Sequence, residues 1–230
     1  MQTINTFSMG KIRFSIVVAL FSVLSVLSQN NGNAKVSGSL YINPVKAKDK
    51  PLGSPYSEIS FAKANVSKIN TVAYMRYNTF ADEFEFITPK NDTLILDKLE
   101  DFAQINFMGI NKKYELLAYT DNKKLVYGYL IIAHEINGFT LYKKENVNYT
   151  EAKIAKTSFE LNMPARFTKV GDTFFFKNKS GTTTAFPDGK KALLKAFPEK
   201  KSAIEAFLSE NKLDFKSEKD LQKLMDLIAR

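Results

Sequence analysis

The residues between Val72 and Thr88 constrain the fold of this chain more strongly than any other stretch. Apolar and polar side chains alternate with a period of two over 72–78 and again over 83–88, and both runs are rich in β-branched and aromatic residues. The break between them, 79–82, has the length of a four-residue hairpin loop. We therefore predict an antiparallel hairpin with one apolar and one charged face, as in a sheet that covers a core.

The predicted loop also determines which residues of the two runs face each other. It places Arg76 opposite Glu85 and Asn78 opposite Glu83. The other side chains share the apolar face, which is expected to lie on the core. They are Ala73, Met75, Tyr77, Phe84 and Phe86.

The first 28 residues have the pattern of a secretion signal. Lys11 and Arg13 precede an apolar run over 14–27, and small residues allow cleavage before Gln29. The alternative is a membrane anchor, but about 20 apolar residues are needed to cross a bilayer and this run is shorter. We expect 1–28 to be a signal peptide. The mature protein is then exported to the periplasm, the outer membrane or the extracellular space, without stable insertion into a membrane.

The composition favours an exported protein that is stabilised by packing alone. None of the 230 residues is cysteine, so the chain has no disulfide and no lipoprotein attachment site, which fits a bacterial envelope. The formal charge is +9, and it becomes +7 without the signal because that segment holds two of the 33 basic and none of the 24 acidic residues. The lysines are scattered among acids, whereas nucleic-acid binding needs a clustered basic face. We therefore expect no nucleic-acid partner.

The rest of the chain divides into three regions by composition and periodicity. Residues 29–52 are polar and interrupted by glycine and proline, which predicts a flexible N-terminal arm. Residues 53–187 contain further short runs with a period of two, and Asn137-Gly138 is the strongest hairpin signal among their turns. The period then changes to 3.6, so 188–230 predict a helical segment.

Three short amphipathic helices are expected in the C-terminal segment. Asp188 is a candidate cap for the first, Pro198 ends it and suits the first turn of the second, and Ser217 starts the third. Because isolated helices this short are marginal in water, we expect them to pack on the sheet. The predicted fold class is α+β, a curved antiparallel β-sheet or open barrel with a packed C-terminal helical segment. The apolar positions expected to face the sheet are Leu193, Phe197, Ile204, Phe207, Leu221, Leu224 and Ile228.

Three short motifs, in this order, resemble a known family. They are Gly-Ser-Pro-Tyr at 53–56, Arg-Tyr-Asn at 76–78 with Asp-Glu-Phe-Glu at 82–85, and Phe-Pro-Glu-Lys-Lys at 197–201. Together they resemble a family of uncharacterised exported proteins of Bacteroidota, the flavobacteria and their relatives. The resemblance extends from Gly53 to the C-terminus. It implies an exported β unit with a helical tail, and it implies no activity.

The sequence contains no arrangement of residues that is typical of catalysis or metal binding. His134 is the single histidine and there is no cysteine, so neither a nucleophile–base pair nor a zinc site is predicted. We expect no enzymatic activity, no cofactor and no metal. The alternative is a glycan-acting hydrolase that uses the carboxylates of Asp82, Glu83 and Glu85. Glu83 and Glu85 would lie about 7 Å apart on one strand, and Arg76 could neutralise one of them.

We expect a non-enzymatic binding or interaction module whose partner is an envelope protein or a glycan. The candidate ligand-binding residues are on the charged face of the hairpin, and they are Tyr74, Arg76, Glu83 and Glu85. Tyrosine rings are amphipathic, and on strands they suit a binding face. The alternative is that each ring fills the edge of a core. The tyrosines considered are Tyr74, Tyr127, Tyr129, Tyr142 and Tyr149.

One modification site is expected as well. The sequence Asp92-Thr93-Leu94 resembles the acceptor for O-glycosylation in Bacteroidota, with Thr93 as the modified residue. It follows a predicted turn, where a sugar could be accommodated.

Overall fold

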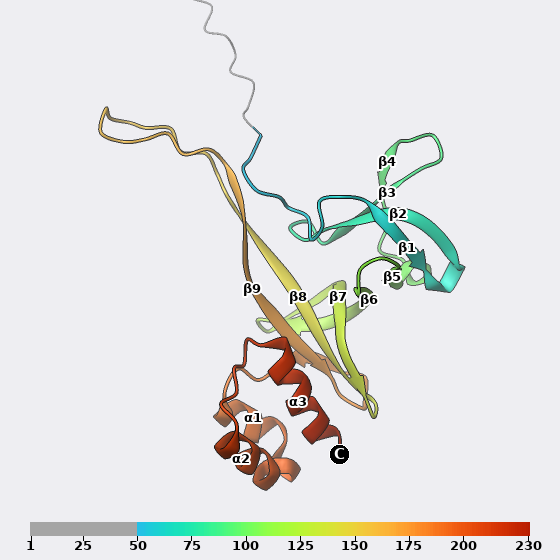
Figure 1. The fold of residues 1–230 in the computed structure, drawn as a ribbon, viewed down its shortest axis with the longest axis vertical. Coiled ribbons are helices and arrows are strands. Elements are labelled where there is room, and N and C mark those ends of the chain that lie inside the picture. Colours follow the sequence, from blue (N-terminus) through green and yellow to red (C-terminus); the bar gives the residue numbers. More distant parts are fainter. Residues whose placement is uncertain (1–49) are drawn as a thin grey trace, which may run out of the picture. The chain divides into compact units, whose positions relative to one another are not determined.

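The computed structural model of the chain describes residues 50–230, which form a mostly antiparallel sheet followed by short helices (Figure 1). The signal peptide expected at 1–28 and residues 29–49 of the expected N-terminal arm lie outside the described residues. Within the described range, no helix is long and apolar enough to cross a membrane. The secondary structure agrees with the predicted α+β class.

The described part of the chain contributes ten strands to one sheet. Their order across the sheet is β10-β9-β8-β7-β6-β5-β1-β2-β3-β4, so β1 joins the hairpin strands to the rest of the sheet. The bounds are β1 Ala62–Val66, β2 Thr71–Asn78, β3 Glu83–Ile87, β4 Thr93–Ile95, β5 Gln104–Phe107, β6 Lys113–Asp121, β7 Lys124–Ile136, β8 Phe139–Thr150, β9 Arg166–Lys177 and β10 Thr183–Ala185.

The predicted hairpin consists of β2 and β3, and its register is confirmed. Arg76 pairs with Glu85 and Asn78 pairs with Glu83 across the two strands. The apolar face lies in the core, as the alternation of side chains requires. It contributes the buried Met75, Tyr77 and Phe84, with Ala73 and Phe86 packed against them.

The predicted Asn137-Gly138 turn joins β7 to β8. Both residues have positive φ, 48° and 83°. A two-residue turn with the twist of the flanking strands needs positive φ at both central positions, which asparagine and glycine tolerate best. The Asn137 side chain also donates to the carbonyl of Ala229 at 3.1 Å, so the turn contacts the end of the chain.

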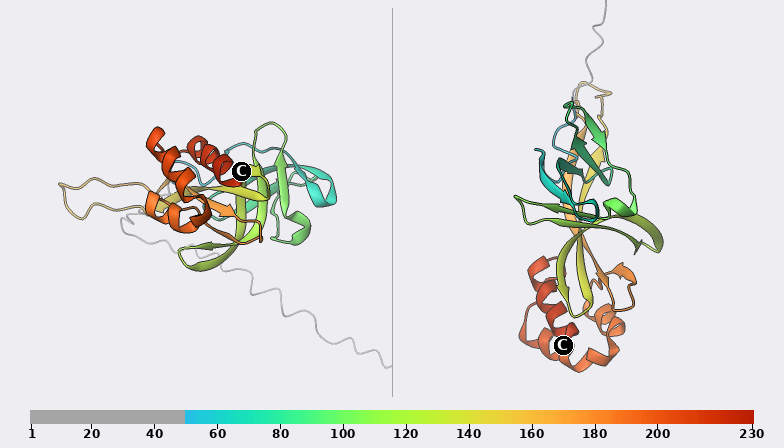
Figure 2. Two further views of the ribbon diagram at one scale, coloured as in Figure 1. Left: turned by 90° about the horizontal axis from the view of Figure 1, so that it is seen from below. Right: turned by 90° about the vertical axis from the view of Figure 1, so that its right-hand side faces the viewer.

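The sheet bends until β10 meets β6, which gives the expected curvature (Figure 2). The contact is a single parallel pair, Thr184 with Thr120. One pair does not make a clear barrel, because β4 remains at the opposite end of the strand order. Side chains inside the bend form a small buried cluster of Tyr119, Leu130, Tyr142 and Phe175.

Three α-helices and three 3-10 turns are present in the described chain. Pro198 opens a 3-10 turn between the first two α-helices, as its fixed φ and missing N–H favour. The 3-10 turns are η1 Ser67–Ile69, η2 Glu100–Phe102 and η3 Pro198–Lys200, and the α-helices are α1 Lys190–Ala196, α2 Lys201–Glu210 and α3 Glu218–Ala229.

The expected helix starts are confirmed in one case and wrong in another. Ser217 is the N-cap of α3, and its side chain accepts from the Asp220 N–H at 3.4 Å. Asp188 does not cap α1. The helix starts one residue later than the pattern predicts, so Gly189 occupies the N-cap position. Glycine has no side chain that could cap the helix.

The C-terminal segment packs on the sheet as expected, through α3 against β7 and β8. Two contacts between side chains help to hold it there beside the apolar face. The His134 ring Nε2 lies 2.7 Å from Asp226 Oδ1, and Lys143 Nζ lies 2.7 Å from Glu218 Oε2. The buried side chains shared by the helices and the sheet are Leu141, Phe174, Phe186, Leu193, Phe197, Ile204, Leu221, Leu224, Met225 and Ile228.

Candidate functional site

Arg76 and Glu85, two of the predicted ligand-binding residues, are bound to each other. Arg76 Nε donates to Glu85 Oε2 at 2.8 Å, and a second guanidinium nitrogen lies 2.6 Å from the same oxygen. Tyr56 completes the cluster, since its hydroxyl donates to Glu85 Oε1 at 3.0 Å and accepts from Arg76 at 2.9 Å. The guanidinium also lies over the rings of Tyr56 and Phe61, 3.8 and 4.4 Å from their centroids. The cluster therefore holds the chain before β1 on the hairpin. We call this part of the chain, residues 52–61, the N-terminal segment.

Asp82 is also engaged, and it connects the hairpin loop to β7. Its Oδ1 accepts from the Tyr77 hydroxyl at 2.6 Å and from the Tyr129 N–H at 3.1 Å. Its Oδ2 lies 2.6 Å from Lys98 Nζ. Gly128 makes this approach possible, because a Cβ there would lie 2.3 Å from the Asp82 carboxylate. A carboxylate held by three donors positions the loop.

The predicted binding tyrosines divide into two groups. Tyr74, Tyr127 and Tyr149 are 51%, 50% and 41% exposed. Tyr129 and Tyr142 are buried, so the expectation of exposed rings is wrong for them. Both belong to cores that form where the curved sheet brings strands together.

The expected modification site lies at the start of β4, the last strand in the sheet order. All three residues of β4, Thr93–Ile95, are exposed. The Asp92 N–H donates to the Thr88 hydroxyl at 3.2 Å, within the turn before the strand. An exposed hydroxyl after a turn is accessible to an enzyme, and modification of Thr93 remains a proposal.

A polar cluster that the sequence did not predict lies around Ser57. The Ser57 hydroxyl donates to Glu145 Oε2 at 2.5 Å and accepts from Lys112 Nζ at 2.6 Å. Lys112 also reaches Glu145 Oε1 at 2.8 Å and Glu58 Oε1 at 3.2 Å. Ser57, Lys112 and Glu145 are 33 to 88 residues apart in the chain, so no local pattern could have identified the cluster.

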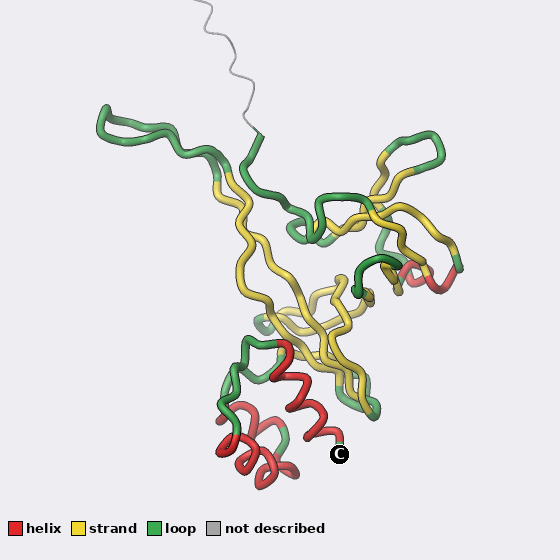
Figure 3. Tube along the Cα trace, in the orientation of Figure 1, coloured by secondary structure: helices red, strands yellow, loops and turns green. Residues whose placement is uncertain are grey.

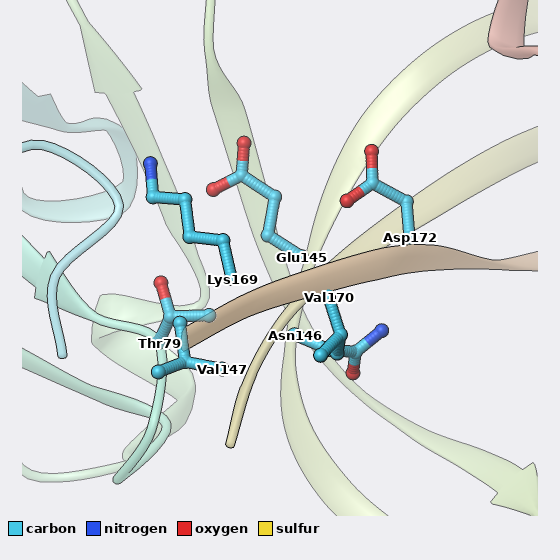
Figure 4. A pocket seen from close by; sticks show the side chains of 7 residues that line it. All are labelled: Thr79, Glu145, Asn146, Val147, Lys169, Val170 and Asp172. Atoms are coloured by element: carbon cyan, nitrogen blue, oxygen red, sulfur yellow. The ribbon is translucent and has the colours of Figure 1, made fainter. Parts of the chain in front are cut away.

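A β-bulge places Glu145 in this cluster. The register between β8 and β9 shifts between Lys144 and Asn146, and such shifts re-aim side chains. A hollow of about 80 Å³ adjoins the cluster. Figure 4 shows the charged side chains of Glu145, Lys169 and Asp172 on one side of β9. The residues that line the hollow are Thr79, Glu145, Asn146, Val147, Lys169, Val170 and Asp172.

The residue types around Ser57 are those of an activated nucleophile, but the contacts are those of a closed network. A serine nucleophile needs a base that takes its proton, and often an oxyanion site beside it. Lys112 forms ion pairs with the carboxylates of Glu145 and Glu58. The Ser57 N–H is not available for an oxyanion site, because it donates to the Tyr77 carbonyl at 3.0 Å. We interpret the cluster as a structural link between the N-terminal segment, β8 and the β5–β6 loop.

Glu145 and Asp172 have pKa shifts of opposite sign. Burial alone would raise the pKa of Glu145, but hydrogen bonds from Lys112 and Ser57 and the nearby cations outweigh burial and lower it. Burial raises the pKa of Asp172, and the carboxylate of Glu145 adds to that effect. Ionised Glu145 therefore stabilises the fold, whereas ionised Asp172 destabilises it.

These shifts predict opposite effects of two isosteric substitutions on thermal stability. Glu145→Gln is expected to lower the melting temperature at pH 7. The difference from wild type should shrink as the pH falls below the ordinary glutamate pKa of 4.5, because the wild type loses this contribution there. Asp172→Asn is expected to raise the melting temperature at pH 7, with the gain disappearing towards pH values below 3.8. Melting curves of the three proteins from neutral to acidic pH test this, and equal effects of both substitutions would contradict it.

The chain between β8 and β9 forms a long hairpin end over 151–165, which we call the 151–165 tip. Figure 3 shows it drawn as loop beyond the two paired strands. One pair of backbone hydrogen bonds joins its sides, from each of Lys153 and Met163 to the carbonyl of the other at 2.8 Å. Four large apolar side chains of the tip are exposed: Ile154 at 77%, Phe159 at 98%, Leu161 at 86% and Met163 at 53%.

The base of the tip is fixed by the N-terminal segment. The Leu52 N–H donates to the Ala165 carbonyl, and the Phe167 N–H donates to the Leu52 carbonyl, both at 2.8 Å. Gly53 follows with φ of 76°, and a Cβ there would lie 2.2 Å from the Phe167 carbonyl oxygen. Glycine is thus required for this close approach.

An aromatic cluster supports the same base from the hairpin side. Phe80, in the β2–β3 loop, lies 6.0 Å from Tyr149 of β8 and 5.4 Å from Phe167 of β9 between ring centroids. Tyr149 and Phe167 are 4.9 Å apart. Such pairs stabilise by about 0.5–1.5 kcal/mol beyond their buried area. The β8–β9 hairpin is therefore held at the base of the tip, while the apolar side chains of the tip are exposed.

No local pattern distinguished the tip from the core, because its apolar residues resemble those of any strand. Comparison of the chain with protein-family models, with curated proteins and with solved structures finds no match.

Proposed function

We propose that the protein is a non-enzymatic binding module of the cell envelope that contacts its partner through the 151–165 tip. The exposure of Ile154, Phe159 and Leu161 at 77%, 98% and 86% carries this proposal. Single exposed apolar residues are common on protein surfaces, but a contiguous group of them marks an interaction site. The fixed base of the β8–β9 hairpin supports the proposal, because binding of a partner then does not have to order the two strands.

The chemistry of the tip favours an apolar partner surface. Phenylalanine, leucine and isoleucine offer no hydrogen bond to the hydroxyl groups of a sugar, whereas tyrosine does. A glycan is therefore a weaker match to the tip than an apolar surface of the envelope. Export remains an expectation from the N-terminal sequence pattern.

The hydrolase alternative is disfavoured, because two of its three candidate carboxylates, Asp82 and Glu85, are occupied within the fold and only Glu83 remains. Glycoside hydrolysis needs one carboxyl group that donates a proton and a second that attacks or activates water. Asp82 is held by Lys98 and two hydrogen-bond donors, and Glu85 is held by Arg76 and Tyr56. We therefore retain the binding function alone.

The proposed function predicts that polar substitutions at the tip weaken binding to envelope material. Phe159→Ser combined with Leu161→Ser is expected to lower the retention of the purified protein on envelope fragments from the producing cells at least about tenfold, since each buried apolar side chain contributes about 1.5–3 kcal/mol. Sedimentation with the fragments measures this. Leu125→Ser and Ile59→Ser are matched controls, because these side chains are 79% and 70% exposed but lie elsewhere. Equal retention of the tip variant and the wild type would rule out the proposal.

A further inference from the structure

We infer that the first two helices of the C-terminal segment carry a binding site for an acidic polysaccharide, separate from the 151–165 tip. Residues 190–201, from the start of α1 to the start of α2, contain five lysines and one acidic residue, Glu199. Their net charge of +4 is more than half of the +7 of the mature sequence. We call these lysines the 190–201 lysine cluster, and they are Lys190, Lys191, Lys195, Lys200 and Lys201.

The cluster has no counter-ion within the described part of the chain. None of its five lysines forms an ion pair with a described residue. By contrast, Lys98, Lys112 and Lys143 are each bound to a carboxylate. Lys200 is half-buried and the other four lysines of the cluster are exposed. Their charges are therefore accessible to a partner.

The positions of these lysines are unfavourable for the helices themselves. Lys191 and Lys195 are four residues apart in α1, so they lie on one face of the helix and repel each other. Lys190, Lys191 and Lys201 lie in the first turns of α1 and α2, where the helix dipole disfavours positive charge. Neither of these turns contains an acid, whereas the first turn of α3 contains two. A bound polyanion would offset the repulsion, so binding explains an arrangement that helix stability does not.

The cluster extends over several elements, which favours a polymer over a single small anion. Its lysines are distributed over α1, η3 and α2, which follow each other directly (Figure 1). At 1.5 Å per residue, α1 alone is about 10 Å long. One small anion cannot contact charges that are spread over such a distance, whereas the repeated acidic groups of a polymer can.

The surroundings of the lysines favour a polysaccharide over other polyanions. No large apolar side chain of 188–230 is exposed, because residues such as Leu193, Phe197 and Ile204 face the core. Protein interfaces are enriched in aromatic residues and depleted in lysine, insertion into a membrane needs an apolar face, and single-stranded nucleic acids stack on exposed aromatic rings. Lysine ammonium groups are point charges on flexible stems, and lysine-rich stretches of this kind are typical of heparin-type sites.

Titration of the full-length mature protein with two acidic polysaccharides tests this inference. Heparin carries sulfate groups and polygalacturonate carries carboxylates, and the wild type is expected to bind both but not neutral dextran. Lys191→Gln combined with Lys195→Gln and Lys201→Gln is expected to weaken binding at least about tenfold at low salt, with a smaller difference at high salt. Calorimetric titration measures the affinities. Melting curves should show no loss of stability, because the three side chains are exposed and one repulsive pair is removed.

The matched control removes three lysines from other parts of the surface. Lys50→Gln combined with Lys90→Gln and Lys124→Gln changes the net charge equally, and these lysines are exposed and form no ion pair with a described residue. We expect the affinity for heparin to change by no more than about twofold, because distant charges are screened. An equal loss of affinity in the two triple variants would overturn the inference, since net charge and not the cluster would then attract the polymers.

Other polyanions and the tip variant complete the test. A wild type that binds neither acidic polysaccharide would contradict the inference. Tighter binding to phosphatidylglycerol vesicles or to duplex DNA than to both polysaccharides would also contradict it, because the partner would then be a different polyanion. Phe159→Ser combined with Leu161→Ser should leave heparin binding unchanged. A loss of heparin binding in that variant would place the site at the tip and not at the helices.

Discussion

Replacing Phe84 by alanine is expected to lower the free energy of unfolding by about 3–5 kcal/mol. Phe84 is 0% exposed and contacts three buried tyrosine rings, at centroid distances of 4.9 Å to Tyr77, 5.0 Å to Tyr114 and 4.7 Å to Tyr129. Truncation leaves a cavity that these large rings cannot fill without leaving their own contacts. The loss is a large share of a typical stability of about 5–15 kcal/mol. Denaturant unfolding measures it.

Phe159→Ala is the matched control for this substitution. It removes the same side chain from a position that is 98% exposed, so the free energy of unfolding should change by no more than about 0.5 kcal/mol. Equal effects of Phe84→Ala and Phe159→Ala would contradict the buried position of Phe84 and with it the hairpin core.

Replacing Leu224 by alanine is expected to lower the free energy of unfolding by about 2–5 kcal/mol in one cooperative transition. Leu224 is 0% exposed, and it belongs to the core that α3 shares with the sheet. Phe207 of α2, which the sequence also places on the apolar stripe, is only partly buried, so Leu224 is the sharper probe. Thermal unfolding followed at once by far-ultraviolet and near-ultraviolet circular dichroism tests the single transition.

Lys223→Ala on the exposed side of the same helix is the control, because alanine is the best helix former and the 3.3 Å contact of Lys223 with Asp220 is a surface ion pair. Its effect should remain below about 1 kcal/mol. A main transition that is unmoved by Leu224→Ala, with only a helical signal lost earlier, would mean that the C-terminal segment is independent of the sheet.

The sequence by itself determined those features whose cause is local. The period of two and the loop length gave the β2–β3 register, with Arg76 opposite Glu85. The Asn137-Gly138 pair gave a turn, because its backbone preference does not depend on distant residues. In the same way, helical spacing identified Leu221, Leu224 and Ile228, three of the buried positions of α3.

Only the tertiary structure decided how distant segments meet. Arg76 and Glu85 were expected to face a ligand, yet Tyr56 and Phe61 cover the guanidinium from another part of the chain. Tyr129 and Tyr142 look like exposed strand tyrosines in the sequence but are buried. Their burial follows from the curvature of the sheet and the strand order, which no single strand specifies.

The exposure of the 151–165 tip and the contacts of the Ser57 cluster also depend on segments that are distant in the sequence. Apolar residues such as Phe159 have the same local pattern whether a sheet covers them or not, so their exposure depends on the absence of a facing element in the described chain. Ser57, Lys112 and Glu145 are ordinary polar residues until the strand order brings them within hydrogen-bond distance. Periodicity is set by neighbours along the chain, whereas burial and charge pairing are set by segments that meet only after the sheet has formed.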